Sequence, residues 1–227
     1  MNHKEILGKL ESLSDPRAVE GMARFGIRGR NAFGISIPNL RGIAREAGRD
    51  HGLAQRLWDS GIHEARILAG MVDVPEEVTE AQMERWVKAF DSWDLCDQVC
   101  MNLFSKTPLA YKKAAEWSSR KEEFVKRAGF ATMAALAVGD KKAEDRQFEM
   151  FLPIIKRESA DDRNYVRKAV NWALRQIGKR NIRLNRLAIE TAKDVQKTGS
   201  KAAKWIASDA LRELTSDAVR KRLEKKK

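Results

Sequence analysis

Five basic and aromatic side chains recur at helical spacing in one segment of the chain. They are Tyr165, Lys168, Trp172, Arg175 and Lys179. Steps of three and four residues keep side chains on one face of an α-helix, so these five are expected to form one stripe. Lysine and arginine neutralise phosphates and aromatic rings stack on sugars or bases, which is typical of nucleic-acid binding. In the structural alternative, Trp172 packs into a neighbouring element while the cations stay solvated.

A tryptophan and a carboxylate share a face near the start of another predicted helix. Trp93 and Asp97 are four residues apart. Asp91 is expected to cap this helix, and Asp94 falls in its first turn, where exposed N–H groups favour a carboxylate. Asp94 is therefore expected to be structural. Taken alone, Asp97 fits an ordinary surface position.

A single cation precedes the most apolar run of the sequence. Arg127 is followed by Ala128-Gly-Phe-Ala-Thr-Met-Ala-Ala-Leu-Ala, which predicts a central helix packed on all sides. A cation at the mouth of such a helix requires a carboxylate, a phosphate or solvent. Asp97 is a candidate partner.

Short amphipathic helices with brief breaks must hold these side chains. They are expected near residues 3–13, 16–25, 38–50, 52–60, 63–72, 79–91, 93–104, 107–118, 121–138, 144–157, 162–179, 183–197, 201–213 and 215–224. Proline or glycine marks most of the breaks. The main irregular segment runs from Gly26 to Ile37 and contains Gly26, Gly29 and Gly34.

The order of the helices predicts a repeat architecture. Helices that pair about every 35 to 40 residues are typical of stacked hairpins in HEAT-like solenoids. A weak internal echo supports this: Phe124-Val-Lys-Arg-Ala and Tyr165-Val-Arg-Lys-Ala begin 41 residues apart. The inner face of the helix expected at 162–179 should carry an apolar stripe of Val166, Val170, Ala173 and Ile177. A compact helical bundle is the competing architecture.

The net charge of +12 comes entirely from the C-terminal third. Residues 1–155 contain 23 Lys and Arg against 23 Asp and Glu, whereas residues 156–227 contain 21 against 9. Such an asymmetry indicates a surface that faces a polyanion, and nucleic acid is the favoured partner. A solubilising surface is the alternative interpretation.

Several classes of protein are disfavoured. Cys96 and Cys100 are one helical turn apart and are expected to be small buried residues, because the histidines that metal binding would require are scattered. These are His3, His51 and His63. We find no P-loop, dinucleotide fingerprint, disulfide framework, signal peptide or membrane-spanning run. We therefore expect a cytoplasmic protein without metal or cofactor.

Short motifs in a fixed order resemble the AlkD branch of the DNA alkylation repair family. They are Met22-Ala-Arg-Phe25, Gly34-Ile-x-Ile-Pro38-x-Leu-Arg41, Trp93-Asp-x-x-Asp97, Lys126-Arg-Ala128 and Tyr165-x-Arg-Lys-Ala-Val-Asn-Trp172-Ala-Leu-Arg175. The resemblance runs over nearly the whole chain. It implies a single domain over residues 1–227, all-α, in which HEAT-like repeats form a right-handed α-solenoid with a concave DNA-binding cleft.

The resemblance also implies an activity. Active members excise cationic N3- or N7-alkylated purines from duplex DNA and leave an abasic site, and the AlkD type acts on a base left in the helix. The catalytic Asp corresponds to Asp97, the cleft tryptophans to Trp93 and Trp172, and the cleft arginine to Arg127. The residues expected to contact DNA are Phe25, Tyr165, Lys168, Arg175 and Lys179. We therefore predict a monomeric DNA glycosylase, a hydrolase whose partner is duplex DNA.

Phe25 departs from the family pattern, and two alternatives stay open. Characterised glycosylases of this type have Tyr after Met-Ala-Arg, so Phe25 keeps the ring and loses the hydroxyl. Other branches of the family bind DNA of unusual structure without glycosylase activity, which makes a non-catalytic HEAT-like DNA-binding protein the first alternative. The second is a helical-repeat scaffold for an acidic protein partner.

Overall fold

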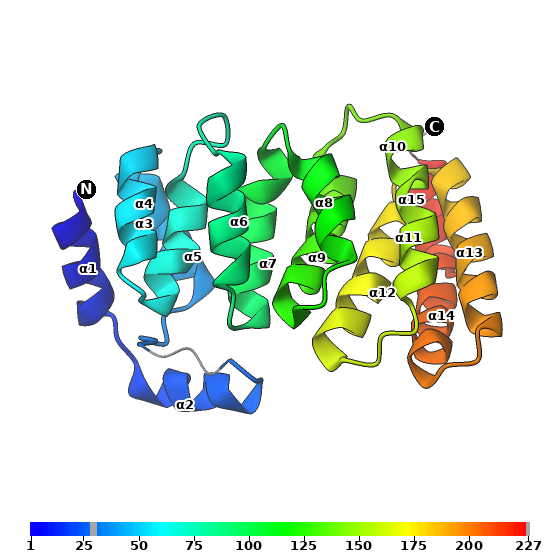
Figure 1. Cartoon of the computed structure of the whole chain (residues 1–227), viewed down its shortest axis with the longest axis horizontal. Helices are drawn as coiled ribbons and strands as arrows, with labels where there is room; N and C mark the ends of the chain where they lie inside the picture. The colour runs from blue at the N-terminus through cyan, green and yellow to red at the C-terminus, as the bar shows by residue number, and fades with distance from the viewer. Residues whose placement is uncertain (28–30, 226–227) are drawn as a thin grey trace. The chain divides into compact units, whose positions relative to one another are not determined.

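The computed structural model describes residues 1–27 and 31–225, and every regular element in these ranges is a helix (Figure 1). The expected all-α class is confirmed. The chain divides into two compact units, Met1–Leu109 and Ala110–Lys227. Gly29 of the predicted irregular segment lies outside the described residues. None of the described helices combines the length and the apolar character that crossing a bilayer requires.

The first unit is built around one central helix. Its elements are α1 (His3–Ser12), α2 (Pro16–Arg24), α3 (Ile37–Ala47), α4 (His51–Asp59), α5 (His63–Val72), α6 (Glu80–Lys88), α7 (Trp93–Asn102) and the 3₁₀ turn η1 (Phe104–Lys106). Helix α5 is buried along most of its length and packs against α3, α4 and α7. In Figure 1, α2 runs crosswise to the other helices of this unit, and none of its residues is buried.

The second unit is centred on two long helices. Its elements are α8 (Ala110–Ser118), α9 (Glu123–Gly139), α10 (Asp145–Glu149), α11 (Phe151–Glu158), α12 (Asn164–Gly178), α13 (Ile182–Lys197), α14 (Lys201–Leu214) and α15 (Asp217–Glu224). Helix α9 packs against α8 and α12, and α12 also packs against α13 and α14. The four apolar residues expected on the inner face of α12 are fully buried, as predicted.

Two local predictions are wrong. The segment 144–157 forms two helices, because Pro153 lacks the N–H that would bond the carbonyl of Glu149 and its ring crowds that carbonyl. Asp91 is not the cap of α7. Ser92 occupies that position with extended backbone directly before Trp93, so Asp91 lies one residue too early.

Gly129 marks the closest approach of α8 and α9. A Cβ at Gly129 would lie 2.6 Å from the backbone nitrogen of Ser118 and 2.9 Å from the carbonyl oxygen of Ala114. We expect Gly129→Ala to lower the free energy of unfolding by about 2 kcal/mol, because neither backbone atom can rotate away. Urea unfolding measures this change. Gly139→Ala on the same helix is the control, since nothing lies within 4 Å of its Cβ, and equal losses in the two variants would contradict the close contact.

Candidate functional site

Helix α7 presents the first pair of predicted site residues. Trp93 is its first residue, and Asp97 lies one turn further on, with 8% of its surface exposed. The indole N–H of Trp93 donates to the carbonyl oxygen of Phe25 at 3.0 Å. Phe25 directly follows α2, and this residue is 71% exposed. The structure therefore joins Phe25 and Trp93, which are 68 positions apart in the sequence.

An ion pair between buried His63 and half-buried Asp94 holds the start of α7 against α5. Nε2 of His63 lies 2.8 Å from a carboxylate oxygen of Asp94, so Asp94 is structural, as predicted. Burial alone would lower the pKa of His63, but the hydrogen bond to Asp94 and its negative charge raise that pKa above its usual value. Burial alone would raise the pKa of Asp94, but the same contact lowers it. Both shifts favour the charged pair.

The pair makes stability depend on pH. His63 has a raised folded pKa, so its contribution is complete below its unfolded value of 6.5 and is lost as pH rises through the folded value. Asp94 has a lowered folded pKa, so its contribution is complete above 3.8 and is lost as pH falls through the folded value. We expect His63→Gln to cost about 2 kcal/mol between these limits and less at alkaline pH, measured by urea unfolding across pH. A cost that stays constant into alkaline pH would contradict the charged pair.

Glu64, the next residue of α5, anchors the segment that follows Phe25. Its buried carboxylate accepts hydrogen bonds from the backbone N–H groups of Phe33, Gly34 and Ile35 at 2.9, 2.7 and 3.3 Å. Gly34 has a φ of +76°, and a Cβ there would lie 2.5 Å from the carbonyl oxygen of Asp15. The glycine of the sequence motif is therefore required by both its backbone conformation and the close approach of another segment.

Arg127 lies on α9 in the second unit, among the buried residues of the predicted central helix. It is 6% exposed, and its guanidinium donates to the carbonyl oxygen of Tyr165 at 2.6 Å. The ring of Tyr165 lies 5.6 Å from that of Phe124, the residue at the matching position of the internal echo. Arg127 and Tyr165 are thus brought together. The pairing of Arg127 with Asp97 stays a prediction.

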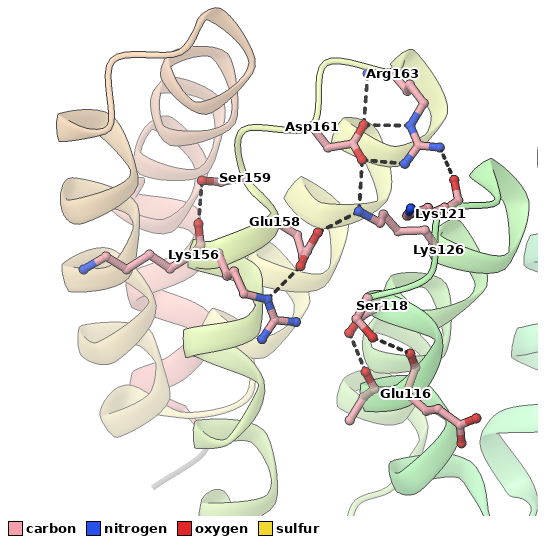
Figure 2. Close-up of polar contacts among 12 residues, drawn as sticks. Glu116, Ser118, Lys121, Lys126, Lys156, Glu158, Ser159, Asp161 and Arg163 are labelled. Carbon is pink, nitrogen blue, oxygen red and sulfur yellow. Dashed lines mark hydrogen bonds and ion pairs between the residues drawn. The ribbon is translucent and has the colours of Figure 1, made fainter.

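Ion pairs tie the loop before α12 to the beginning of α9 (Figure 2). The Lys126 ammonium lies 2.7 Å from Glu158 and 3.2 Å from Asp161. Arg163 pairs with Asp161 at 2.6 Å and donates to the carbonyl oxygen of Lys121. Burial opposes ionisation of Asp161, but the hydrogen bonds from Arg163 and Lys126 keep its pKa below the usual value. The network fixes the end of α12 that carries Tyr165.

The basic stripe of α12 is present, but two of its cations are paired within the protein. Lys168 is exposed, and Tyr165 and Trp172 are half-buried. Arg175 and Lys179 both contact the carboxylate of Glu213 on α14 at 2.6 Å. Spacing along α12 identifies the stripe correctly, whereas the acidic residue that faces it comes from a helix distant in sequence.

The residues of α5 that hold the start of α7 and the segment from Phe33 to Ile35 were not predicted from the sequence. His63 and Glu64 begin a mostly apolar helix, and two buried polar residues at such a start are a signal of partners elsewhere in the fold. Cys96 and Cys100 are fully buried, as predicted. Within residues 1–27 and 31–225, His, Cys, Asp and Glu side chains form no group of three that could hold a metal ion.

Comparisons with known proteins show the family from a family model and the fold from a solved structure. The family model described as DNA alkylation repair enzyme matches residues 6–214. One solved structure is described as a new family of proteins related to the HEAT-like repeat DNA glycosylases with affinity for branched DNA structures. It aligns with a TM-score of 0.78 and 21% sequence identity, over 98% of this chain and 96% of that chain. No curated protein matches. The likeness confirms the expected HEAT-like repeat fold.

Proposed function

Because this chain belongs to the DNA alkylation repair enzyme family, we propose that it is a DNA glycosylase that excises cationic N3- or N7-alkylated purines from duplex DNA. One observation carries the proposal. The nearly buried carboxylate of Asp97 lies one turn into α7 from Trp93, whose indole is held by the backbone of Phe25. A carboxylate and an electron-rich ring on one helix face suit a reaction that develops positive charge.

The chemistry of the lesion determines what the protein must supply. An N3- or N7-alkylated purine is already cationic, so it departs as a neutral base with the electron pair of the glycosidic bond and requires no strong general acid. The deoxyribose then carries oxocarbenium character. We assign Asp97 to stabilise this cation and to orient the water that adds to C1′ and loses a proton. The products are the released base and an abasic site.

The remaining residues are assigned to binding and orientation. Trp93 and Trp172 offer ring faces to the cationic sugar or base, each contributing about 0.5 to 2 kcal/mol. The bond to the Tyr165 carbonyl orients the guanidinium of Arg127, which we assign to a phosphate beside the lesion. We further propose that the base reacts while it is stacked in the helix, because the bond to a cationic purine is intrinsically labile.

We assign the basic stripe of α12 and the exposed Phe25 to contacts with the DNA. Lys168 is exposed and contributes most directly to phosphate binding. Arg175 and Lys179 share the carboxylate of Glu213, so their attraction for a phosphate is partly cancelled. We expect smaller losses of DNA affinity from these two than from Lys168.

Selectivity for charged lesions tests the mechanism. The purified protein is incubated with methylated duplex DNA and, separately, with duplex that contains hypoxanthine. We expect release of 3-methyladenine and 7-methylguanine, quantified by chromatography, and none of hypoxanthine, because a neutral base requires protonation to leave. Release of hypoxanthine at a comparable rate would contradict a mechanism that depends on the charge of the lesion.

A second candidate function is recognition of branched DNA without chemistry. It is favoured by the similar solved structure, whose description gives affinity for branched DNA, and by Phe25, which lacks the tyrosine hydroxyl. Under this alternative the protein binds a four-way junction more tightly than the matching duplex and releases no base. Base release and junction affinity, measured on the same preparation, distinguish the two functions.

A further inference from the structure

A pocket of about 620 Å³ in the first unit gathers four cations that the proposed reaction does not use. They are Arg41, Arg45, Arg49 and Lys106. All four side chains are exposed at the surface, and Met71 and Asn102 also line the pocket. The charge balance of residues 1–155 is neutral, so the total charge gives no sign of this cluster.

The three arginines follow one another at intervals of four residues, and we call them the arginine row. Arg41 and Arg45 are four residues apart on α3, so their backbones lie about 6 Å apart along the helix axis on one face. Arg49 comes directly after Gly48, which caps the C-terminus of α3. Its guanidinium donates to the carbonyl oxygen of Asp73, which holds it at the pocket. The row therefore contributes three successive cations to the lining of the pocket.

Nearby carboxylates are engaged with other partners. The carboxylate of Asp73 contacts His51 at 2.7 Å and Gln82 at 2.6 Å, and Glu46 of α3 pairs with Lys9 at 2.6 Å. No aspartate or glutamate lines the pocket among the described residues. Partial burial of the exposed Lys106 side chain and the positive charge of Arg49 lower the pKa of Lys106, as expected where like charges gather.

A second basic pocket, in the other unit, shows the contrast. It has a volume of about 450 Å³, and Asp145 is part of its lining. The lining cation Lys179 pairs with Glu213, and Arg180 donates to the carbonyl oxygens of Ala137 and Ala143. That pocket has a carboxylate in its lining and a lining lysine paired with Glu213, whereas no carboxylate lines the pocket on α3 among the described residues.

We propose that the pocket on α3 binds consecutive phosphates of a DNA strand, as a backbone site additional to the α12 stripe. The proposal rests on the proposed DNA-binding function. One strand of a duplex presents a phosphate about every 3.4 Å of helix axis, so a row of exposed arginines suits several neighbouring phosphates. Met71 supplies an apolar surface for the sugars between them. A compact free anion would not require a row that is open to solvent.

Salt dependence of binding to undamaged duplex tests the site in the full-length protein. The variant is Arg45→Gln combined with Lys106→Gln. The control is Arg56→Gln combined with Lys88→Gln, which removes the same charge from exposed positions of the same unit outside the pocket. The logarithm of the DNA association constant falls linearly with the logarithm of salt concentration, and each lost phosphate contact makes this slope less steep by about 0.9. We expect the slope to become less steep by about 1.8 in the pocket variant and to keep the wild-type value in the control.

Two results would overturn the proposal. One is an unchanged slope in the pocket variant, and the other is an equal loss of slope in the control. Inorganic tripolyphosphate provides a further arm. If it raises the melting temperature of the wild type but not of the pocket variant, while both bind duplex with the same slope, the ligand is a free polyphosphate and the DNA proposal is wrong.

The outcome is separable from that of the proposed glycosylase. Base release from methylated duplex is measured on the same variants at saturating protein concentration, where we expect unchanged rates. If the wild type releases no base but the pocket variant still has a weaker salt dependence, the glycosylase proposal is wrong and the phosphate site stands. If the wild type releases base but the pocket variant keeps the wild-type slope, the phosphate site is wrong and the glycosylase proposal stands.

Discussion

Replacing Asp97 with asparagine is expected to slow release of alkylated bases by about 10²- to 10³-fold, which corresponds to about 3 to 4 kcal/mol of transition-state stabilisation. The amide has the shape of the carboxylate but no charge, so it cannot stabilise a developing oxocarbenium ion. Affinity for undamaged duplex should change little, because Asp97 is acidic and nearly buried and is not a phosphate ligand.

Single-turnover kinetics with excess protein measure this effect, since they isolate the chemical step from product release. Asp91→Asn is the matched control, because Asp91 is exposed and lies just before α7. It removes the same charge and should leave the rate unchanged. Equal losses of rate and of DNA affinity in the Asp97 variant would assign Asp97 to binding or folding instead.

Glu64→Gln is expected to lower the free energy of unfolding by about 2 to 3 kcal/mol. Glu64 accepts three backbone N–H bonds, and a glutamine amide places an NH₂ group where one carboxylate oxygen now accepts. At least one buried donor then faces another donor. The local loss of stability should be largest from Phe33 to Ile35. This segment follows Phe25, whose carbonyl oxygen accepts the hydrogen bond from Trp93.

Hydrogen exchange and urea unfolding together measure this prediction. The amides of Phe33, Gly34 and Ile35 should exchange faster in the variant than in the wild type. Glu76→Gln is the control, because it removes a negative charge from an exposed position of the same unit. Unchanged protection of the three amides would mean that Glu64 does not anchor this segment.

Helix positions were predictable because periodicity and punctuation are local. The expected span 63–72 coincides with α5, and the expected inner face of α12 is buried from Val166 to Ile177. The errors lie where one backbone group decides the outcome. Pro153 divides the helix expected at 144–157, and the cap of α7 shifts by one residue to Ser92.

The sequence allows residues of the candidate site to be proposed, but not the contacts that hold them in place. Spacing and resemblance identify Trp93, Asp97 and the α12 stripe. They could not indicate that His63 binds Asp94 or that Glu213 binds Arg175, because these contacts join residues more than 30 positions apart. Such contacts arise from packing, which periodicity does not encode.

The arginine row of α3 illustrates another gap between sequence and structure. Its four-residue spacing is visible in the sequence, but acidic residues elsewhere balance the total charge of that region. Only the fold shows that Asp73 and Glu46 bind other partners and that Lys106 joins the row from η1. Local charge, rather than net charge, indicates such a surface.

Product stoichiometry on a defined duplex with a single 7-methylguanine tests the glycosylase assignment most directly. Free 7-methylguanine is quantified by mass spectrometry, and abasic sites are quantified by strand cleavage after alkali treatment. We predict that the wild-type protein forms one free base and one abasic site for each lesion consumed. Intact lesions after prolonged incubation, with salt-sensitive duplex binding retained, would contradict the assignment and identify a protein that binds DNA without catalysing its repair.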